Sequence, residues 1–234
     1  MKENKALRTL ICLTIILSMA IPPLSTVVRA SAVVGLPSQH DSHLYTVGNS
    51  SPGVLLTGGW NLISLPIMPF DTAIESVLAP MNRSDQLKSV WYFDQCEDPV
   101  PDLGKWHVYD ATTGTGDLNT VEAGKAYWLL MLSPGDAGYD ASAFPISLWV
   151  FGTEAPMPPE LPSSYHVCRG WNMVGFRSME EMAPENYLGT FDPSEYGGIY
   201  GWDSYLQDWI ANPDKLVPGQ GYWIPFSVEG AIHP

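Results

Sequence analysis

The chain has 234 residues and a formal net charge of −14, with 12% aromatic residues, 21 glycines, 21 prolines and 3 cysteines. So acidic a chain repels phosphate backbones, which excludes a general nucleic-acid-binding role. Beyond the N-terminal segment considered next, about 200 residues remain, enough for two domains of about 100 residues each.

The first 32 residues have the pattern of a secretory signal peptide. Basic residues at positions 2, 5 and 8 precede a mostly apolar run over residues 10–24, and Ala30-Ser31-Ala32 fits a small-residue cleavage site. Pro22 and Pro23 would interrupt a spanning helix, which disfavours the alternative of an uncleaved anchor. We therefore expect residues 1–32 to be a signal peptide that leaves no membrane span after cleavage.

The segment that follows, residues 33–52, is rich in Ser, Gly, Pro and His and is expected to form a flexible leader. Removal of residues 1–32 leaves 7 basic and 24 acidic residues, a net charge of −17. A charge of this sign suits an extracellular location and solubility.

The rest of the chain contains one motif twice. Gly59-Trp60-Asn61-Leu62-Ile63 returns as Gly170-Trp171-Asn172-Met173-Val174, and Gly124-Lys125-Ala126-Tyr127-Trp128 returns as Gly219-Gln220-Gly221-Tyr222-Trp223. The separation of 111 residues between Trp60 and Trp171 is too long for a solenoid and suits two small domains in tandem. We predict β-rich repeat 1 at residues 53–152, a proline-rich linker at residues 153–164 and β-rich repeat 2 at residues 165–234.

Both repeats show the same order of predicted elements. In repeat 1 we expect strands at 54–57 and 61–67, a short helix, an aromatic hairpin at 90–94 and 106–110, and strands at 126–132 and 146–151. In repeat 2 we expect strands at 165–169 and 172–177, a short helix, a tighter hairpin at 199–203 and 208–210, and strands at 221–226 and 228–232.

The short helix of each repeat is predicted from a capping-box spacing, Thr72 with Glu75 and Ser178 with Glu181. Pro80 and Pro184 are expected to keep both helices short. The predicted fold is mainly β, a β-rich α+β arrangement of two tandem small barrel- or sandwich-like domains, each with one short helix.

These motifs carry a family resemblance. The order Gly-Trp-Asn-Met-Val-Gly, then Ile-Tyr-Gly-Trp-Asp, then Pro-Gly-Gln-Gly-Tyr-Trp-Ile in repeat 2 resembles a tandem repeat of exported cell-surface, S-layer-associated proteins of archaea and bacteria. That family's usual motifs read Gly-Trp-Asn-Leu-Val-Gly and Pro-Gly-Lys-Gly-Tyr-Trp-Ile. Repeat 1 departs from them at Ala126, which replaces the second glycine. The resemblance implies a surface-exposed β-rich module with no assigned catalytic residues.

The tryptophans allow two interpretations. Trp60, Trp128, Trp171 and Trp223 recur at matched positions, which favours a role in the cores of two small domains. The hairpin tryptophans could equally fill the cores or face solvent as flat platforms for sugar rings. They are the candidate ligand-binding residues Trp91, Trp106, Trp202 and Trp209.

Carboxylates are densest in the loop of the first hairpin. Calcium needs several oxygen ligands from one loop or from converging loops, and Asp94, Glu97, Asp98 and Asp102 are the candidate set. The alternative is a solvated acidic loop, because no Asp-x-Asp-x-Asp-Gly pattern is present. Calcium is therefore the only cofactor that the sequence leaves open.

Two cysteines follow the signal segment, Cys96 and Cys168. An even pair in an exported protein is typical of a disulfide, which here would join the two repeats. Two separate thiols are the alternative, and the sequence leaves both open. We expect no zinc site from the two cysteines alone, because zinc prefers four ligands and no nearby Cys or His pairs supply the others.

The sequence predicts a protein that is not an enzyme and has no catalytic residues. It contains no Gly-x-Ser-x-Gly elbow, His-Glu-x-x-His pair or phosphate-binding loop. The predicted function is that of an exported structural or adhesive protein at the cell surface or in the extracellular space. Its candidate partners are itself, other envelope proteins and glycans. Two alternatives remain: a carbohydrate-binding protein that uses the hairpin tryptophans, and a secreted hydrolase whose carboxylates no motif reveals.

Overall fold

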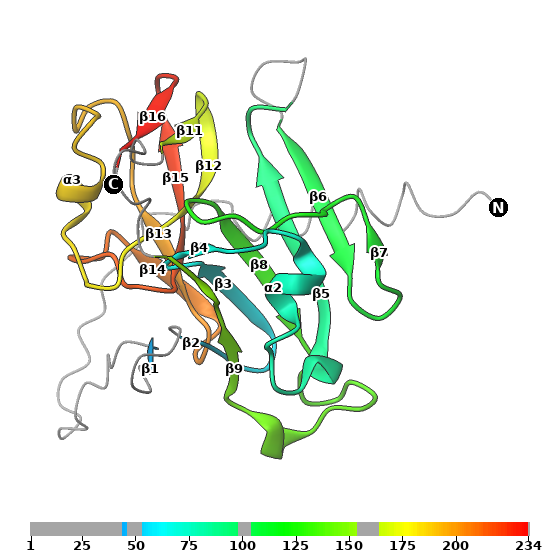
Figure 1. The fold of residues 1–234 in the computed structure, drawn as a ribbon. Helices are drawn as coiled ribbons and strands as arrows, with labels where there is room; N and C mark the ends of the chain where they lie inside the picture. The colour runs from blue at the N-terminus through cyan, green and yellow to red at the C-terminus, as the bar shows by residue number, and fades with distance from the viewer. Residues whose placement is uncertain (1–43, 46–52, 98–103, 154–163, 234) are drawn as a thin grey trace, which may run out of the picture. The chain divides into compact units, whose positions relative to one another are not determined.

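The computed structural model describes residues 44–45, 53–97, 104–153 and 164–233, all within a compact unit of residues 41–234 (Figure 1). The predicted signal peptide, most of the leader and nearly all of the linker lie outside the described residues, as do Asp98 and Asp102. Two leader residues are described, in β1 (Leu44–Tyr45), which pairs with β2. Within the described residues, no helix is both long enough and apolar enough to cross a membrane.

Repeat 1 is built around an antiparallel sheet of five strands in the order β3-β8-β5-β6-β7. Two smaller sheets lie outside it, one of three strands in the order β1-β2-β9 and one of the two strands β4 and β10. The elements are β2 (Gly53–Leu56), β3 (Trp60–Ser64), β4 (Met68–Pro69), α2 (Ile74–Leu78), β5 (Leu87–Asp94), β6 (Lys105–Asp110), β7 (Thr115–Gly116), β8 (Ala126–Met131), β9 (Ile146–Trp149) and β10 (Gly152–Thr153), with 3-10 turns at Ser84–Gln86 and Ala141–Ala143.

Repeat 2 contains a four-stranded antiparallel sheet in the order β12-β15-β13-β14, which repeats the order of the first four strands of the larger sheet. A separate pair, β11-β16, joins the two ends of the repeat. The elements are β11 (Tyr165–Val167), β12 (Gly170–Gly175), α3 (Pro184–Tyr187), β13 (Tyr200–Asp203), β14 (Asp208–Ala211), β15 (Gly221–Phe226) and β16 (Gly230–Ile232). The mainly β fold predicted from the sequence is confirmed.

The helix starts differ from the predicted capping boxes. Ala73 is the N-cap of α2 and makes no side-chain cap, while Asp71 accepts the Ala73 amide hydrogen at 3.0 Å. In repeat 2, Ser178 bonds the Glu180 amide at 3.0 Å in a turn, and α3 begins later, with Pro184 at its first position. The capping-box prediction is wrong because a serine or threonine hydroxyl bonds nearby backbone in turns as readily as at helix starts.

Each repeat has its own hydrophobic core on one face of its sheet. In repeat 1, α2 lies across that face and buries Ile74, Val77 and Leu78 there (Figure 1). Tyr127 and Tyr222 are equivalent residues of β8 and β15, and their hydroxyls accept the amide hydrogens of residues 122 and 217 at 2.8 and 2.7 Å. Burial raises the pKa of both phenols, because a phenolate would be desolvated there.

Candidate functional site

The two repeats contact each other through reciprocal backbone hydrogen bonds. The Ser64 amide donates to the Gly219 carbonyl at 2.9 Å, and the Gly175 amide donates to the Gly124 carbonyl at the same distance. Ser64 is the counterpart of Gly175 in the repeated motif, and Gly124 is the counterpart of Gly219. Each repeat thus presents the same patch to the other, as the two subunits of a two-fold symmetric dimer do. We call this contact the repeat interface.

A second layer of buried residues fills the repeat interface. Leu62, Trp128, Met173 and Trp223 are each only 4–5% exposed but belong to neither repeat's own core. They lie on the sheet faces that point away from those cores, so these faces are buried between the repeats. Trp128 and Trp223, which were expected in the cores of two separate domains, therefore fill the space between two sheets.

The hairpin of each repeat holds the buried tryptophan of the other. Trp128 of repeat 1 lies edge-on to Trp202 and Trp209 of the β13–β14 hairpin, with ring centroids 5.3 and 5.8 Å apart. Reciprocally, Trp223 of repeat 2 packs on Phe93 and Trp106 of the β5–β6 hairpin at 5.5 and 5.9 Å. The two Trp128 pairs are edge-to-face, and pairs of this kind contribute about 0.5–1.5 kcal/mol each beyond their burial.

The four candidate ligand-binding tryptophans are all partly buried and take part in this packing. Trp91 contacts Trp60 and Trp106, and its indole nitrogen donates to Ser89 at 2.7 Å. The indole nitrogen of Trp202 donates to the Trp60 carbonyl at 2.9 Å. Sugar stacking on the hairpin tryptophans stays a prediction, and the rings already have aromatic partners.

Trp171 is an exception to the expected core role. It is 40% exposed, and its ring lies tilted against Tyr200 at 5.7 Å and edge-on to Trp223 at 6.3 Å. Its counterpart Trp60 is partly buried, and its ring packs on Trp91 at 6.5 Å and Trp128 at 5.8 Å. The core prediction for Trp171 is therefore wrong.

A polar clamp precedes the Gly-Trp-Asn strand of each repeat. The Asn61 side chain accepts the Thr57 amide hydrogen at 2.9 Å and donates to the Thr57 carbonyl at 2.9 Å. Asn172 does the same to Cys168, at 3.0 and 2.7 Å. Both asparagines lie near the start of their strands, β3 and β12, and their side chains bond the backbone of the turn that precedes the strand. The clamp fixes Thr57 and Cys168 at equivalent positions.

From these positions each repeat is tied to the hairpin turn of the other. In repeat 1, the Thr57 hydroxyl donates to the Ser204 carbonyl at 2.6 Å. In repeat 2, Cys168 forms a disulfide with Cys96, with 5.4 Å between their Cα atoms. Of the two states that the sequence left open, the structure shows the bridged one. The disulfide of Cys168 thus stands at the position where Thr57, its counterpart in repeat 1, makes a hydrogen bond to the hairpin turn of repeat 2.

The described carboxylates of the acidic loop have protein partners. Asp94 accepts the Cys96 amide hydrogen at 2.8 Å. Glu97 pairs with Lys105 at 2.6 Å and with His107, and the hydrogen bond from Lys105 lowers the pKa of Glu97. Asp98 and Asp102 lie outside the described residues. Calcium binding by this loop stays a prediction.

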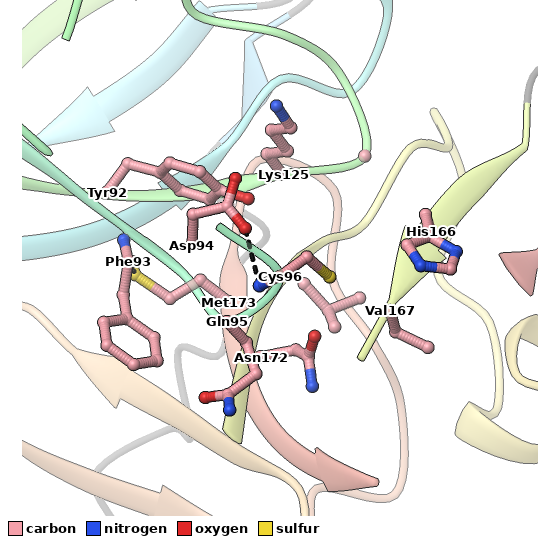
Figure 2. Close-up of a pocket in the computed structure, with 12 residues that line it drawn as sticks. Tyr92, Phe93, Asp94, Gln95, Cys96, Lys125, His166, Val167, Asn172 and Met173 are labelled. Carbon is pink, nitrogen blue, oxygen red and sulfur yellow. Dashed lines mark hydrogen bonds between the residues drawn. The ribbon is translucent and has the colours of Figure 1, made fainter. Parts of the chain in front are cut away.

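A pocket of about 230 Å³ lies at the repeat interface beside the disulfide (Figure 2). It is lined from repeat 1 by Tyr92 to Cys96, Gly124 and Lys125, and from repeat 2 by His166, Val167 and Asn172 to Val174. It is smaller than the roughly 300–1,000 Å³ of most small-molecule sites. A pocket of this size suits an ion or a short side chain better than a sugar.

His166 is the residue at this pocket that sequence reasoning missed. Its Nε2 atom lies 3.5 Å from the Cys168 sulfur and 3.2 Å from a Glu229 oxygen. Cys96, His166 and Cys168 together place three metal-ligand atoms within 4.8 Å of one another. The expectation of no zinc site concerned the two cysteines alone and further Cys or His pairs, not this single histidine, and it stays a prediction. The available signal was the His-x-Cys spacing at residues 166–168.

Neither a family model, nor a curated protein, nor a solved structure matches this chain. Its function is therefore inferred from the residues and contacts described above. These include a buried aromatic interface, a covalent bridge between the repeats and a small pocket with soft ligand atoms.

Proposed function

We propose that this protein is an exported, non-catalytic structural or adhesive component of a cell surface or extracellular assembly. The observation that carries this proposal is the Cys96–Cys168 disulfide, which closes the repeat interface covalently. Disulfides of this kind persist in oxidising compartments outside the cytosol. The signal-like segment at residues 1–32, the acidic composition and the resemblance to S-layer-associated repeats support the same location.

The packing also supports a load-carrying role. One face of each sheet packs on the core of its own repeat, and the other face packs on the opposite repeat. Close packing on both faces leaves little freedom for hinge motion between the repeats. A rigid unit of this kind suits a building block whose shape must persist outside the cell.

One strand edge offers a route to assembly. Among the described residues, β14 is an end strand of the four-stranded sheet and pairs only with β13. An end strand exposes backbone donors and acceptors that a strand of another molecule can bond. Leu206, in the turn before β14, is 76% exposed and adds an apolar contact point. We infer that a second copy or another envelope protein pairs here.

The test combines cellular location with assembly. In the producing cells, the protein should be digested by protease added outside, and its two cysteines should resist alkylation until a reductant is added. The purified exported protein should form large particles in light scattering with size exclusion, compared with and without calcium and a chelator. A cytosolic protein with free thiols, or a monomer at every concentration in both conditions, would refute the proposal.

An alternative function, carbohydrate binding, is favoured by one observation. Trp171 presents 40% of its surface to solvent beside Tyr200, and exposed aromatic faces of this kind stack on sugar rings. Polysaccharide should then quench or shift tryptophan fluorescence in the wild type but not in Trp171→Ala. Trp149→Phe serves as the matched control, because Trp149 lies in β9, outside the repeat interface.

A further inference from the structure

The disulfide is surrounded by further metal-ligating atoms. One imidazole nitrogen of His166 lies within 4.8 Å of both cysteine sulfurs, and Glu229 Oε1 lies 3.2 Å from His166 Nε2. Figure 2 shows the Cys96 sulfur on the side of the pocket that faces His166. The side chains of His166 and Glu229 are 54% and 69% exposed, so an ion in solvent can reach this group.

These positions are held by contacts other than the disulfide itself. Asn172 bonds both the amide and the carbonyl of Cys168, and Asp94 accepts the amide hydrogen of Cys96. His166 is in register with Ala231 in the β11–β16 pair, which also places Glu229 next to it. The aromatic layer holds the two repeats together independently. The cysteines should therefore stay close after the sulfur–sulfur bond is broken.

The spacing suits a tetrahedral zinc ion. Zinc bonds of about 2.3 Å to sulfur and about 2.0–2.1 Å to nitrogen place two sulfur ligands about 3.8 Å apart, and sulfur and nitrogen about 3.6 Å apart. The three ligand atoms already lie within 4.8 Å, and the cysteine Cα atoms are 5.4 Å apart. Side-chain rotation alone can reach the required positions.

We propose that reduction converts this disulfide into a zinc-binding site in which Cys96, Cys168 and His166 are ligands and Glu229 or a water completes the tetrahedron. Two thiolates and an imidazole favour a soft or borderline ion such as Zn²⁺ over Ca²⁺ or Mg²⁺. The site would join the repeats through the metal when the covalent bond is absent. This inference goes beyond the proposed function, because it concerns the reduced chain.

The chemistry balances in two steps. A phosphine supplies two electrons and water supplies two protons and an oxygen atom, so the Cys96–Cys168 bond breaks into two thiols and the phosphine is oxidised to its phosphine oxide. Zn²⁺ then displaces both thiol protons and binds the two thiolates and the neutral imidazole. Binding should consequently strengthen as pH rises through the range in which free thiols ionise.

The experiment titrates the full-length exported protein, reduced with a phosphine and kept anaerobic, with Zn²⁺ in competition with a chromogenic chelator, and with Co²⁺. We expect one Zn²⁺ per chain, and Co²⁺ spectra with a thiolate charge-transfer band and tetrahedral d–d bands. The oxidised protein should show neither. His166→Ala should weaken Zn²⁺ binding by roughly tenfold or more, judged against the 10–100-fold cost of losing even an outer partner of a ligand.

The matched control is His233→Ala, which removes another exposed histidine of repeat 2 and should bind like the wild type. Thermal unfolding of the reduced wild type provides a second measurement, in which Zn²⁺ should raise the melting temperature but leave that of Cys96→Ala/Cys168→Ala unchanged. Equal affinity in His166→Ala and the wild type would overturn the proposal. So would a cobalt spectrum without thiolate bands, equal binding by the oxidised protein, or a reduced chain that stays unfolded with Zn²⁺ present.

Discussion

The Cys96–Cys168 bond should be a major part of the stability of this protein. It closes a loop of 72 residues. In the chain-entropy description, closing a loop of that length removes about 4 kcal/mol of conformational freedom from the unfolded state at 25 °C. We therefore expect Cys96→Ala/Cys168→Ala to lose about 4 kcal/mol of unfolding free energy, which corresponds to a melting temperature lower by roughly 8–16 °C for a chain of this size.

The assay is urea unfolding followed by tryptophan fluorescence, which reports directly on the aromatic layer of the repeat interface. Thr57→Val is the matched comparison, because it removes the hydroxyl that bonds Ser204 at the equivalent contact of the other repeat, together with its longer contact of 3.4 Å to the Asn61 side chain. That variant should lose about 1 kcal/mol. A loss below about 1 kcal/mol in the cysteine variant, or a loss equal to that of Thr57→Val, would show that the covalent link adds nothing to the aromatic packing.

Three further predictions concern the interior. In Gly175→Ala the new methyl group would lie 2.7 Å from the carbonyl carbon of Lys125 in the facing repeat, so we expect a loss of about 2–3 kcal/mol. In Gly189→Ala the nearest atom to the new methyl group would be the Asn186 carbonyl oxygen at 3.3 Å, a milder overlap, so this variant should lose clearly less in the same urea assay. Trp128→Ala should lose about 3–5 kcal/mol and Trp171→Ala about 1 kcal/mol, and the reverse order would contradict the assigned burial. Burial raises the pKa of Tyr222 in the folded state, so the stability that it contributes is present below the unfolded value of about 10 and is lost as pH rises above it. Tyr222→Phe should have a lower unfolding free energy at neutral pH, but its unfolding free energy should fall less than that of the wild type between pH 9 and pH 11 (roughly one unit either side of that value). If the unfolding free energies of the two proteins fell equally over this range, the raised pKa of Tyr222 would not be the cause of the alkaline loss of stability.

The fold was predictable from the sequence to the level of strands and their order. The repeated Gly-Trp-Asn and Tyr-Trp motifs mark β3, β8, β12 and β15, and alternating aromatic and polar residues mark both hairpins. These features are local, because side-chain alternation depends on the strand itself. The helix starts were not predictable. The Ser178 hydroxyl accepts the Glu180 amide hydrogen within a turn and does not cap a helix, and Pro184 is the first residue of α3 and not a residue that ends it.

The repeat interface was harder to predict, because hydrophobic alternation does not distinguish one buried sheet face from two. Trp128 and Trp223 were expected to be buried and are, but they pack between the repeats and not within them. Trp171 is 40% exposed although its counterpart Trp60 is partly buried, so the repeated motif alone does not determine burial.

The candidate site was only partly visible in the sequence. The cysteine pair was identified, but its pairing depends on a contact between the start of one repeat and the hairpin turn of the other. His166 could have been found from its spacing to Cys168. Glu229 could not, because only the β11–β16 pairing brings residues 63 positions apart together.

The disulfide also determines how the chain would respond to mechanical force. A load applied at the two ends of the molecule would pass through the Cys96–Cys168 bond and bypass the 72-residue segment between the cysteines. At about 3.3–3.6 Å per residue, that segment corresponds to roughly 250 Å of length that cannot be drawn out while the bond is intact. Under tension the fully extended oxidised protein is therefore about 250 Å shorter than the fully extended reduced protein.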